Sequence, residues 1–592
     1  MKDFLKLCLA AGCGSFATLT GLGCGGFLFL VMLAAALETA KPVPEGALLV
    51  VDLDLPVADA PRELNPFEVL PMGNGGPTVH PARLWEITDA IRRAAKDDHV
   101  SGVLLRGNVA TTGLHSGWAA LAELREALLD FKQSGKPLCA VATIYEEPTY
   151  YLASAADHVW VDPMGGVLLN GFASSRLYFA SALEKLGVEM QVTRVGRYKS
   201  AVEPFLTDER SPEDREQTTM LLAAIEGAFV NGVTSTRSFD AATLRGWMEE
   251  GVLLSGDESV ARGLTDGALG HADMISELED LMKVDEFETI TIEGYLKPDD
   301  PLKRPKNAVA VIYAEGAIVD GESREEVGGD TLARTLRAAA DNDDFDAVVL
   351  RVNSPGGSAI ASEVILREVV ALSGKKPLIV SMGSLAASGG YWISCQADHI
   401  VAEPTTITGS IGVFGMLPNA GGLLDKLGLS VDVVKTAQHA DVMAIHRAKT
   451  PEEMATIQVI VDSIYDGFLD RVSVGRDMDR EKVAEIAQGR VWSGEQALEL
   501  GLVDELGGLE DAIAFAKARA GLDADAALRF PQAEDPDFMN VMLKELAREG
   551  RDRPLTSTSP FVGEFESLRC ELEALLGQGP VLARMPYLLR VD

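Results

Sequence analysis

The chain has 592 residues and carries 53 Lys and Arg against 89 Asp and Glu, which gives a net charge of −36. A surface this acidic repels phosphate backbones, so we expect no nucleic-acid partner. With 47% apolar and 24% charged residues, the composition is that of a folded protein and excludes a disordered one. The six cysteines form no CxxC pair, which argues against a disulfide framework and against a structural zinc site.

The amino-terminal 40 residues predict a membrane anchor. Residues 7–37 contain no charged side chain, and about 20 apolar residues span a bilayer. Lys2 and Lys6 favour a cytoplasmic amino terminus, which places the rest of the chain on the far side of the membrane. Two alternatives stay open, namely a cleaved signal peptide and a lipoprotein processed at Cys13.

The chain also contains a long internal repeat. Residues 150–158 (YYLASAADH) match residues 391–399 (YWISCQADH), and the offset at the Asp-His pair is 398 − 157 = 241. Residues 103–108 (VLLRGN) also match residues 348–353 (VVLRVN), at an offset of 348 − 103 = 245. A repeat of this length is a duplicated domain and not a solenoid.

Both copies predict short apolar strands that alternate with helices. The strands are expected at 47–53, 103–106, 308–313, 347–352 and 378–381, and helices at 119–133 and 329–341. Such alternation predicts an α/β fold with a parallel sheet covered on both faces. We predict an anchor at 1–40, a first repeat at 41–293, a linker at 294–306, a second repeat at 307–530 and a carboxy-terminal extension at 531–592.

The second repeat contains a candidate nucleophile. Ser388 follows a predicted strand and precedes Gly389, in the sequence AASGGYWIS. We expect this serine to be exposed at the turn, where the Gly389 amide can stabilise an oxyanion. After another strand, the turn at Gly356 and Gly357 can aim a second amide at the same place. Each turn alone is also an ordinary strand-to-helix connection, but the two together favour a catalytic site.

The repeat indicates which base accompanies this serine. Ser388 aligns with 388 − 241 = 147, which is Glu147, whereas Lys199 aligns with 199 + 241 = 440, which is Ala440. Each copy has lost the group that the other keeps, which predicts one composite site. A buried lysine has a lowered pKa and acts as a neutral general base. A surface role for Lys199, and a base at His439 or His446, stay open as alternatives.

Taken together, these motifs resemble the long, tandem-domain form of the bacterial signal peptide peptidase A family, membrane-bound Ser/Lys proteases of the ClpP/crotonase superfamily. The resemblance rests on residues 198–205 (YKSAVEPF), 387–393 (ASGGYWI) and 407–413 (ITGSIGV). It implies two tandem ClpP/crotonase-like domains after a transmembrane helix. It also implies the site residues Ser388 as nucleophile, Lys199 as general base, Ser410 as the hydroxyl that positions the lysine, and Gly389, Gly356 and Gly357 as the oxyanion hole.

The resemblance further implies a biological setting. The expected substrates are cleaved signal peptides and other apolar peptides, and the expected assembly is a bowl-shaped homotetramer. The expected location is the inner membrane, with the catalytic domains on the periplasmic side. Neither a metal nor another cofactor is implied.

Two other functions stay open. A crotonase-type acyl-CoA enzyme shares the implied fold and would need carboxylates at the site, for which Glu146 and Glu147 are the candidates. A catalytically inactive membrane scaffold would require Ser388 and Lys199 to lie apart in space.

Overall fold

The computed structural model describes residues 43–60, 82–109, 117–251, 253–296, 305–323 and 325–531, and the backbone of one strand at Val581–Arg584. The predicted anchor, most of the predicted linker and most of the carboxy-terminal extension lie outside these residues. In the described ranges, no helix has both the length and the apolar character needed to cross a membrane. The domain boundaries drawn from the sequence stay predictions.

The first repeat forms a seven-stranded sheet with a parallel centre. The order is β10 (Thr289–Thr291), β1 (Ala47–Asp52), β4 (Val100–Arg106), β5 (Leu138–Tyr145), β6 (His158–Leu168) and β8 (Leu253–Ser255), and β9 (Gly267–Ala268) also pairs with β6. Val103 packs beneath α2 (Leu84–Lys96) and α3 (Gly117–Lys132). On the opposite face, Leu104 packs against Leu278 of α9 (His271–Met282). The sheet is therefore covered on both faces, as predicted for a buried parallel sheet.

The second repeat forms an eight-stranded sheet of the same kind. The order is β20 (Val491–Ser493), β18 (Ile407–Gly409), β16 (Leu378–Ala387), β14 (Phe345–Ser354), β11 (Ala308–Glu315) and β22 (Leu528–Arg529), while β17 (His399–Ala402) pairs with β16 and with β21 (Glu505–Leu506). Val348 packs with α11 (Gly329–Asp341) and α12 (Ala359–Ser373). Val349 faces the other way, towards α18 (Leu509–Ala520). This repeat is therefore also an α/β sandwich.

Two details of the predicted sheets differ in the structure. The strand expected at 378–381 continues through the small residues to Ala387, because the irregular pairing with β14 beyond Val352 lets a Gly- and Ser-rich segment stay in the sheet. The sheets are also not wholly parallel, since β18 pairs antiparallel with β20 and β6 with β8.

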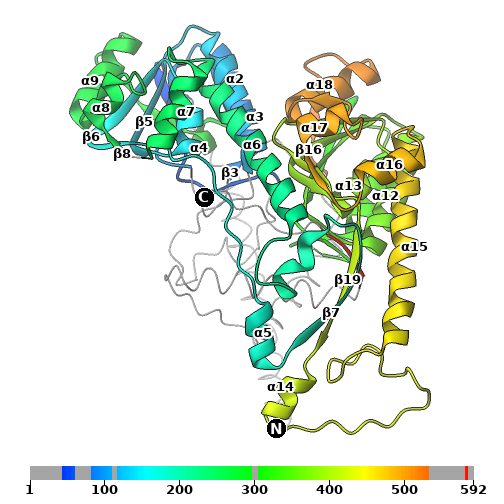
Figure 1. Ribbon diagram of the computed structural model, residues 1–592. Coiled ribbons are helices and arrows are strands. Elements are labelled where there is room, and N and C mark those ends of the chain that lie inside the picture. The colour runs from blue at the N-terminus through cyan, green and yellow to red at the C-terminus, as the bar shows by residue number, and fades with distance from the viewer. Residues whose placement is uncertain are drawn as a thin grey trace, which may run out of the picture.

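A third sheet joins the two repeats. It contains six strands in the order β13 (Val327–Gly328), β12 (Ile318–Val319), β15 (Gly356–Ser358), β23 (Val581–Arg584), β19 (Val413–Asn419) and β7 (Glu189–Val195). β7 comes from the first repeat, yet it pairs antiparallel with β19 of the second over seven residue pairs, from Val413↔Val195 to Asn419↔Glu189. Figure 1 shows the two strands side by side. They extend away from the two lobes, that is, from the large sheet of each repeat with its helices, towards α5 (Ala180–Leu186) and α14 (Gly421–Lys426).

The remaining elements complete the two lobes. They are β2 (Val57–Ala58), β3 (Ala82–Arg83), α4 (Glu147–Ala153), the 3-10 helix η1 (Ser200–Phe205), α6 (Pro212–Thr234), α7 (Ala241–Glu250), α8 (Gly256–Ala261), α10 (Ile292–Tyr295), α13 (Gly389–Ser394), α15 (Pro451–Gly475), α16 (Arg480–Ile486) and α17 (Gly494–Glu499). The long helix α6 leaves the first lobe and reaches the second in Figure 1, and its Gln217 accepts the Val491 N–H there. α6 is therefore a second bridge between the repeats.

A buried ionic cluster also holds the repeats together. Arg351 of β14 is fully buried, and its guanidinium donates to Asp59 and Glu123 of the first repeat. Glu123 also accepts the N–H of Leu509 at the start of α18. Burial raises the pKa of Glu123, while Arg351 opposes the rise. Removing one charge from such a cluster leaves the other charges buried without a partner, which is strongly destabilising. Because the charges come from both repeats, the cluster stabilises the contact between them.

Candidate active site

Ser388 lies at the junction of β16 and α13 in a strained backbone conformation. Its φ is 57° and its ψ −114°, a region that non-glycine residues adopt only when the surroundings enforce it. The Ser388 N–H donates to Gly409 O at 2.8 Å, and Trp392 N–H donates to Ser388 O at 2.8 Å. These bonds fix the turn, so the direction of the Ser388 side chain is set by the backbone.

The side chain of Ser388 is buried, whereas the sequence predicted an exposed serine. The reason is a segment from the other repeat. Lys199 follows β7, and its Nζ lies 2.7 Å from Ser388 Oγ. The pairing of β7 with β19 places Lys199 over Ser388. The sequence of the second repeat alone does not show this contact.

The Lys199 amine has three oxygen neighbours. Besides Ser388 Oγ, Nζ lies 2.9 Å from Ser410 O and 3.0 Å from Ser410 Oγ. The Lys199 side chain is fully buried, and burial lowers the pKa of its amine well below the ordinary value. Within the described part of the chain no carboxylate opposes that shift, so a neutral amine is favoured at this position. The structure thus brings together Ser388 and Lys199, which the repeat predicted to share one site, and Ser410, which the family resemblance implied.

The predicted oxyanion glycines lie beside this group. Gly389 directly follows Ser388 and begins α13. Gly390 packs so closely on Ser354 that a Cβ there would lie 2.7 Å from the Ser354 carbonyl oxygen. The turn that leads to Gly356 and Gly357 therefore packs closely against α13, the helix that follows Ser388. The Gly356 N–H donates to Ser354 Oγ at 3.2 Å within its own turn, and the assignment of the oxyanion amides stays a prediction.

Two residues that the sequence reasoning missed hold the lysine in place. Gln217 of α6 donates to Tyr198 O at 3.2 Å and accepts from Val491 N at 3.3 Å, so it fastens the lysine segment to the second repeat. Gly489 has a φ of +73°, and a Cβ there would lie 2.6 Å from Lys199 Cβ. A polar residue on the buried face of a helix was the available sequence signal for Gln217. None marked Gly489, since its role depends on a distant segment.

The alternative bases lie elsewhere. His439 Nδ1 is 3.2 Å from Glu453 Oε1, in a surface cluster with Arg447. His446 lies in the same loop region, between α14 and α15. Among the described residues, the hydrogen-bond partners of Lys199 and Ser388 include no histidine.

The described part of the first repeat carries no equivalent of this site. Glu147 stands at the position that matches Ser388, and its Oε1 accepts the N–H of Gly171 at 2.8 Å and that of Asn170. Burial raises the pKa of this carboxyl group. Because its oxygen is bound by backbone amides, Glu147 is not placed as the acid or base that an acyl-CoA enzyme would need.

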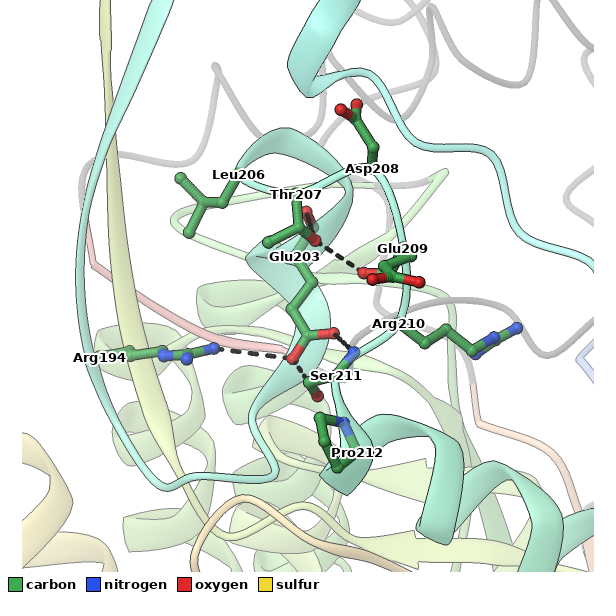
Figure 2. Close-up of a pocket in the computed structure, with 9 residues that line it drawn as sticks. All are labelled: Arg194, Glu203, Leu206, Thr207, Asp208, Glu209, Arg210, Ser211 and Pro212. Carbon is green, nitrogen blue, oxygen red and sulfur yellow. Dashed lines mark hydrogen bonds and ion pairs between the residues drawn. The ribbon is translucent and has the colours of Figure 1, made fainter.

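A surface cavity of about 650 Å³ lies beside the lysine segment and not at Ser388. Its lining residues come from β7, η1 and the loop before α6, and they are Arg194, Glu203, Leu206, Thr207, Asp208, Glu209, Arg210, Ser211 and Pro212 (Figure 2). Glu203 accepts from Ser211 Oγ at 2.7 Å, which closes the loop on η1. The cavity is therefore lined by the segments on either side of Lys199, and neither Ser388 nor Lys199 lines it.

Comparison with known proteins shows which family the chain resembles. The Peptidase family S49 matches residues 130–285 and 371–523, once in each repeat. "Protease 4" of Salmonella typhi is 36% identical over 519 residues, 84% of this chain and 83% of the relative. "Protease 4" of Haemophilus influenzae is 37% identical and covers 90% of this chain and 89% of its own length. The "Putative signal peptide peptidase SppA" of Enterococcus faecium is 35% identical over 44% of this chain and 77% of its own.

Proposed function

Because the chain belongs to peptidase family S49, in its long, tandem form, and is a serine peptidase, we propose that Ser388 is its nucleophile and Lys199 its general base. One observation carries this proposal, namely the 2.7 Å separation of Lys199 Nζ and Ser388 Oγ in a fully buried setting. The distance is that of a hydrogen bond ready for proton transfer.

The three neighbours of the amine suit its neutral form. A neutral amine has two N–H donors and one lone pair, and Ser410 offers two acceptors, its carbonyl and its hydroxyl oxygen. The lone pair then faces Ser388 Oγ and accepts the hydroxyl proton. Ser410 is thus the residue that orients Lys199, because it occupies both donors and leaves only the basic lone pair for the nucleophile.

The reaction then follows acyl transfer. Ser388 Oγ attacks the peptide carbonyl while its proton passes to Lys199, and the resulting oxyanion is held by the amide of Gly389 and one from the Gly356–Gly357 turn. Lys199 gives the proton to the leaving amine as the peptide C–N bond breaks, which leaves an acyl-enzyme. Water loses a proton to Lys199 as it attacks the ester, and Lys199 returns that proton to Ser388 Oγ as the ester C–O bond breaks and the carboxyl product leaves.

We infer that the substrates are apolar peptides, above all cleaved signal peptides. The name of the Enterococcus relative supports this class, and so does the uncharged stretch at residues 7–37, which we propose anchors the enzyme in the inner membrane with both repeats on the periplasmic side. Released signal peptides are themselves membrane-bound apolar segments, so an anchored peptidase meets them where they accumulate.

We also propose that the chain forms a homotetramer. In β7 and β19, Met190 faces Pro418, and the matching positions in the other copies are 190 + 241 = 431 and 418 − 241 = 177. Leu177 and Val431 are 64% and 51% exposed. Among the described residues, neither lies in a strand. The same strand pairing between a first repeat and the second repeat of the next chain is head-to-tail, and such contacts form a ring when the rotation between successive chains closes. We propose that it closes after four chains.

Disulfide trapping tests the assembly. A chain with Leu177→Cys and Val431→Cys should oxidise into a ladder that ends at four chains. The matched control, Leu177→Cys with the exposed Val474→Cys on α15, should give none. A double-cysteine chain that stays at the mass of one chain contradicts the head-to-tail ring.

A serine-reactive fluorophosphonate tests the chemistry. It should label the wild-type protein at Ser388, and labelling should be lost in Ser388→Ala and strongly slowed in Lys199→Ala, because a serine without a base keeps its proton and is a weak nucleophile. Equal labelling of Lys199→Ala would show that another group activates the serine.

A further inference from the structure

Arg490 of the second repeat lies between two aromatic rings next to the proposed base. Its guanidinium carbon is 4.7 Å from the ring centre of Tyr198, the residue before Lys199, and 4.4 Å from a ring centre of Trp492. Tyr198 belongs to the first repeat, and Trp492 to β20 of the second. A cation over an aromatic face is attracted to it, more strongly where water is excluded. The guanidinium therefore joins the lysine segment to β20.

Glu216 of α6 completes this contact. Its carboxylate lies 2.9 Å from Arg490 Nη2 and accepts the hydroxyl proton of Tyr198 at 3.0 Å. Arg490 Nη1 also donates to the Tyr198 hydroxyl, at 3.3 Å. Tyr198 is thus held at its ring face and at its hydroxyl by two groups that also bind each other. Because Lys199 follows Tyr198 directly, these contacts fix the start of the lysine side chain.

The backbone of Arg490 supports the residue that orients the lysine. Its carbonyl oxygen accepts the Ser410 N–H at 2.7 Å. Ser410 has a φ of 51°, which a non-glycine residue keeps only when its surroundings enforce it. The preceding residue, Gly409, accepts the Ser388 N–H. Arg490 thus contacts the segment of the base through its side chain and the segment of the orienting hydroxyl through its backbone.

Two features of Arg490 argue against a purely stabilising role. Its Nε is buried and, within the described ranges, has no hydrogen-bond partner, and an unpaired buried donor costs free energy. The repeat provides the second feature. With the offset of 494 − 256 = 238 that relates the two Ser-Gly pairs, Arg490 matches 490 − 238 = 252, which is Val252. The copy without the nucleophile therefore has an apolar residue at this position.

We propose that Arg490 is a positioning residue for Lys199, because its guanidinium fixes Tyr198 against β20 and so keeps the Lys199 amine buried at Ser388 Oγ. The inference rests on the proposed function, in which Lys199 is the general base. Displacing a reacting group by about 1 Å costs up to roughly 10²-fold in rate. Arg490 acts through packing and not through its charge, since burial is the cause of the lowered pKa of Lys199.

The rate at which a fluorophosphonate labels Ser388 tests the inference. Arg490→Met keeps an unbranched apolar stem but loses the guanidinium, and labelling should slow roughly tenfold. Arg490→Lys keeps a cation without the planar fork and should slow labelling by less, which provides a second variant if the methionine chain does not fold. The matched control is Arg262→Met in the first repeat, which removes a guanidinium from Trp247 and Glu250. Its labelling rate should stay within about a factor of two of the wild type.

The pH dependence of labelling separates positioning from a general loss of stability. A loosened lysine segment admits water to the amine, so its pKa returns towards the ordinary lysine value. The pH at which labelling reaches half its maximal rate should therefore rise by about one unit in Arg490→Met and stay unchanged in Arg262→Met. A merely structural arginine would lower thermal stability without moving this midpoint.

A double-mutant cycle with Lys199→Ala distinguishes failure of this inference from failure of the proposed function. If Arg490 acts through Lys199, adding Arg490→Met to Lys199→Ala should slow the residual labelling no further. Wild-type labelling of both Arg490 variants, with an unchanged midpoint, would overturn the inference and leave the Ser388–Lys199 pair standing. A tenfold slowing that persists in the Lys199→Ala background would also overturn it, because Arg490 would then act on another group. Labelling of Lys199→Ala itself at the wild-type rate would instead refute the proposed function.

Discussion

At the position where the second repeat carries Ser388, the first repeat carries Glu147, and the two side chains meet different partners. Glu147 turns its carboxylate onto the N–H groups of Asn170 and Gly171 within its own repeat. Ser388 instead faces Lys199, a residue of the other repeat. In the first repeat this position is satisfied by hydrogen bonds within the same repeat. In the second repeat the side chain contacts a residue of the other repeat. In the proposed mechanism, the nucleophile and its base are thus divided between two copies of one fold.

Two arginines at matching positions of the two sheets also differ in whether their partners come from the same repeat or from the other one. Arg106 and Arg351 lie at equivalent positions in β4 and β14. The side chain of Arg106 is 55% exposed and pairs with Asp52 of its own repeat. Arg351 is fully buried, and its carboxylate partners come from the first repeat. The second repeat therefore depends on the first both for Lys199, its proposed base, and for the carboxylates that neutralise Arg351.

The strongest test of this division is to remove either half of the reacting pair. Ser388→Ala and Lys199→Ala should each reduce kcat/KM by a factor on the order of 10³ or more, because nucleophile and base act as one unit. Both proteins should remain folded and unfold cooperatively. Peptidase assays with a short apolar peptide, together with thermal unfolding, check this.

The repeat supplies the matched control. Ala440 occupies the position that corresponds to Lys199, and Ala440→Lys should leave kcat/KM within about a factor of two, since surface substitutions away from a site have small effects. Near wild-type turnover in Lys199→Ala would refute the composite site and return attention to His439 and His446.

The pH profile should reveal the buried amine. Burial lowers the pKa of Lys199 well below the ordinary lysine value, which is about 10.4. Only the neutral amine accepts the serine proton, so kcat/KM should rise as the pH passes upward through this lowered pKa and then level off. Between this lowered pKa and the ordinary lysine value, the unfolded chain binds one more proton than the folded chain at this residue, so stability should rise with pH over that range. An activity increase that begins only near the ordinary lysine value would mean that Lys199 is solvated.

A glycine of the second repeat should matter for a lysine of the first. Gly489→Ala would place a Cβ 2.6 Å from Lys199 Cβ, and displacing a reacting group by about 1 Å costs up to roughly 10²-fold in rate. We expect kcat to fall by about 10- to 100-fold with KM little changed. Gly428→Ala is the control, because it has a similar φ of +69° but no described atom within 4 Å of the added Cβ. Equal losses of kcat in the two variants would show that backbone strain at a positive φ, and not contact with Lys199, causes the effect.

Arg351 and Arg106 offer a matched test of stability. Arg351→Met leaves Asp59 and Glu123 buried without their cation, and breaking a buried ion pair costs about 3–5 kcal/mol. Arg106→Met removes an exposed pair, which is worth about 0–1 kcal/mol. Urea unfolding should therefore show a large loss for the first variant and a small one for the second. Similar losses would show that the two repeats are not held together by this cluster.

The sequence was sufficient to single out Ser388 and Lys199 as candidates for one site, because the offset of the repeat is 241 both at the Asp-His pair and at Leu186 and Leu427. A constant offset of 241 connects Ser388 with Glu147 and Lys199 with Ala440, so the complementary loss is visible in the order of the residues alone. The alternating strands and helices were equally visible, because buried parallel strands are short apolar runs.

The remainder depends on contacts between distant segments. The sequence predicted an exposed Ser388, which was wrong because β7 of the first repeat pairs with β19 and carries Lys199 over it. Gln217 and Gly489 act through packing against the lysine segment, which no local pattern encodes. The place of β23 between β15 and β19 follows from pairing across most of the second repeat. Cross-repeat strand register is thus the part of this fold that sequence periodicity does not specify.

The smallest expected effect concerns the predicted anchor, which neither repeat needs for chemistry. A chain that begins at Lys41 keeps Ser388, Lys199 and Ser410, so it should be soluble and should cleave a short apolar peptide in solution with wild-type kcat/KM. Between residue 37, where the uncharged stretch ends, and β1 at Ala47 lie about ten residues, which span at most ~35 Å when extended. An enzyme anchored by this stretch, as proposed, would therefore be held at the bilayer surface, where membrane-bound apolar peptides reside. In membranes loaded with cleaved signal peptides, the shortened chain should clear them more slowly than the full chain, as measured by the loss of labelled peptide with time. Equal clearance by both chains would show that the amino-terminal stretch directs the protein to the membrane without presenting substrate to it.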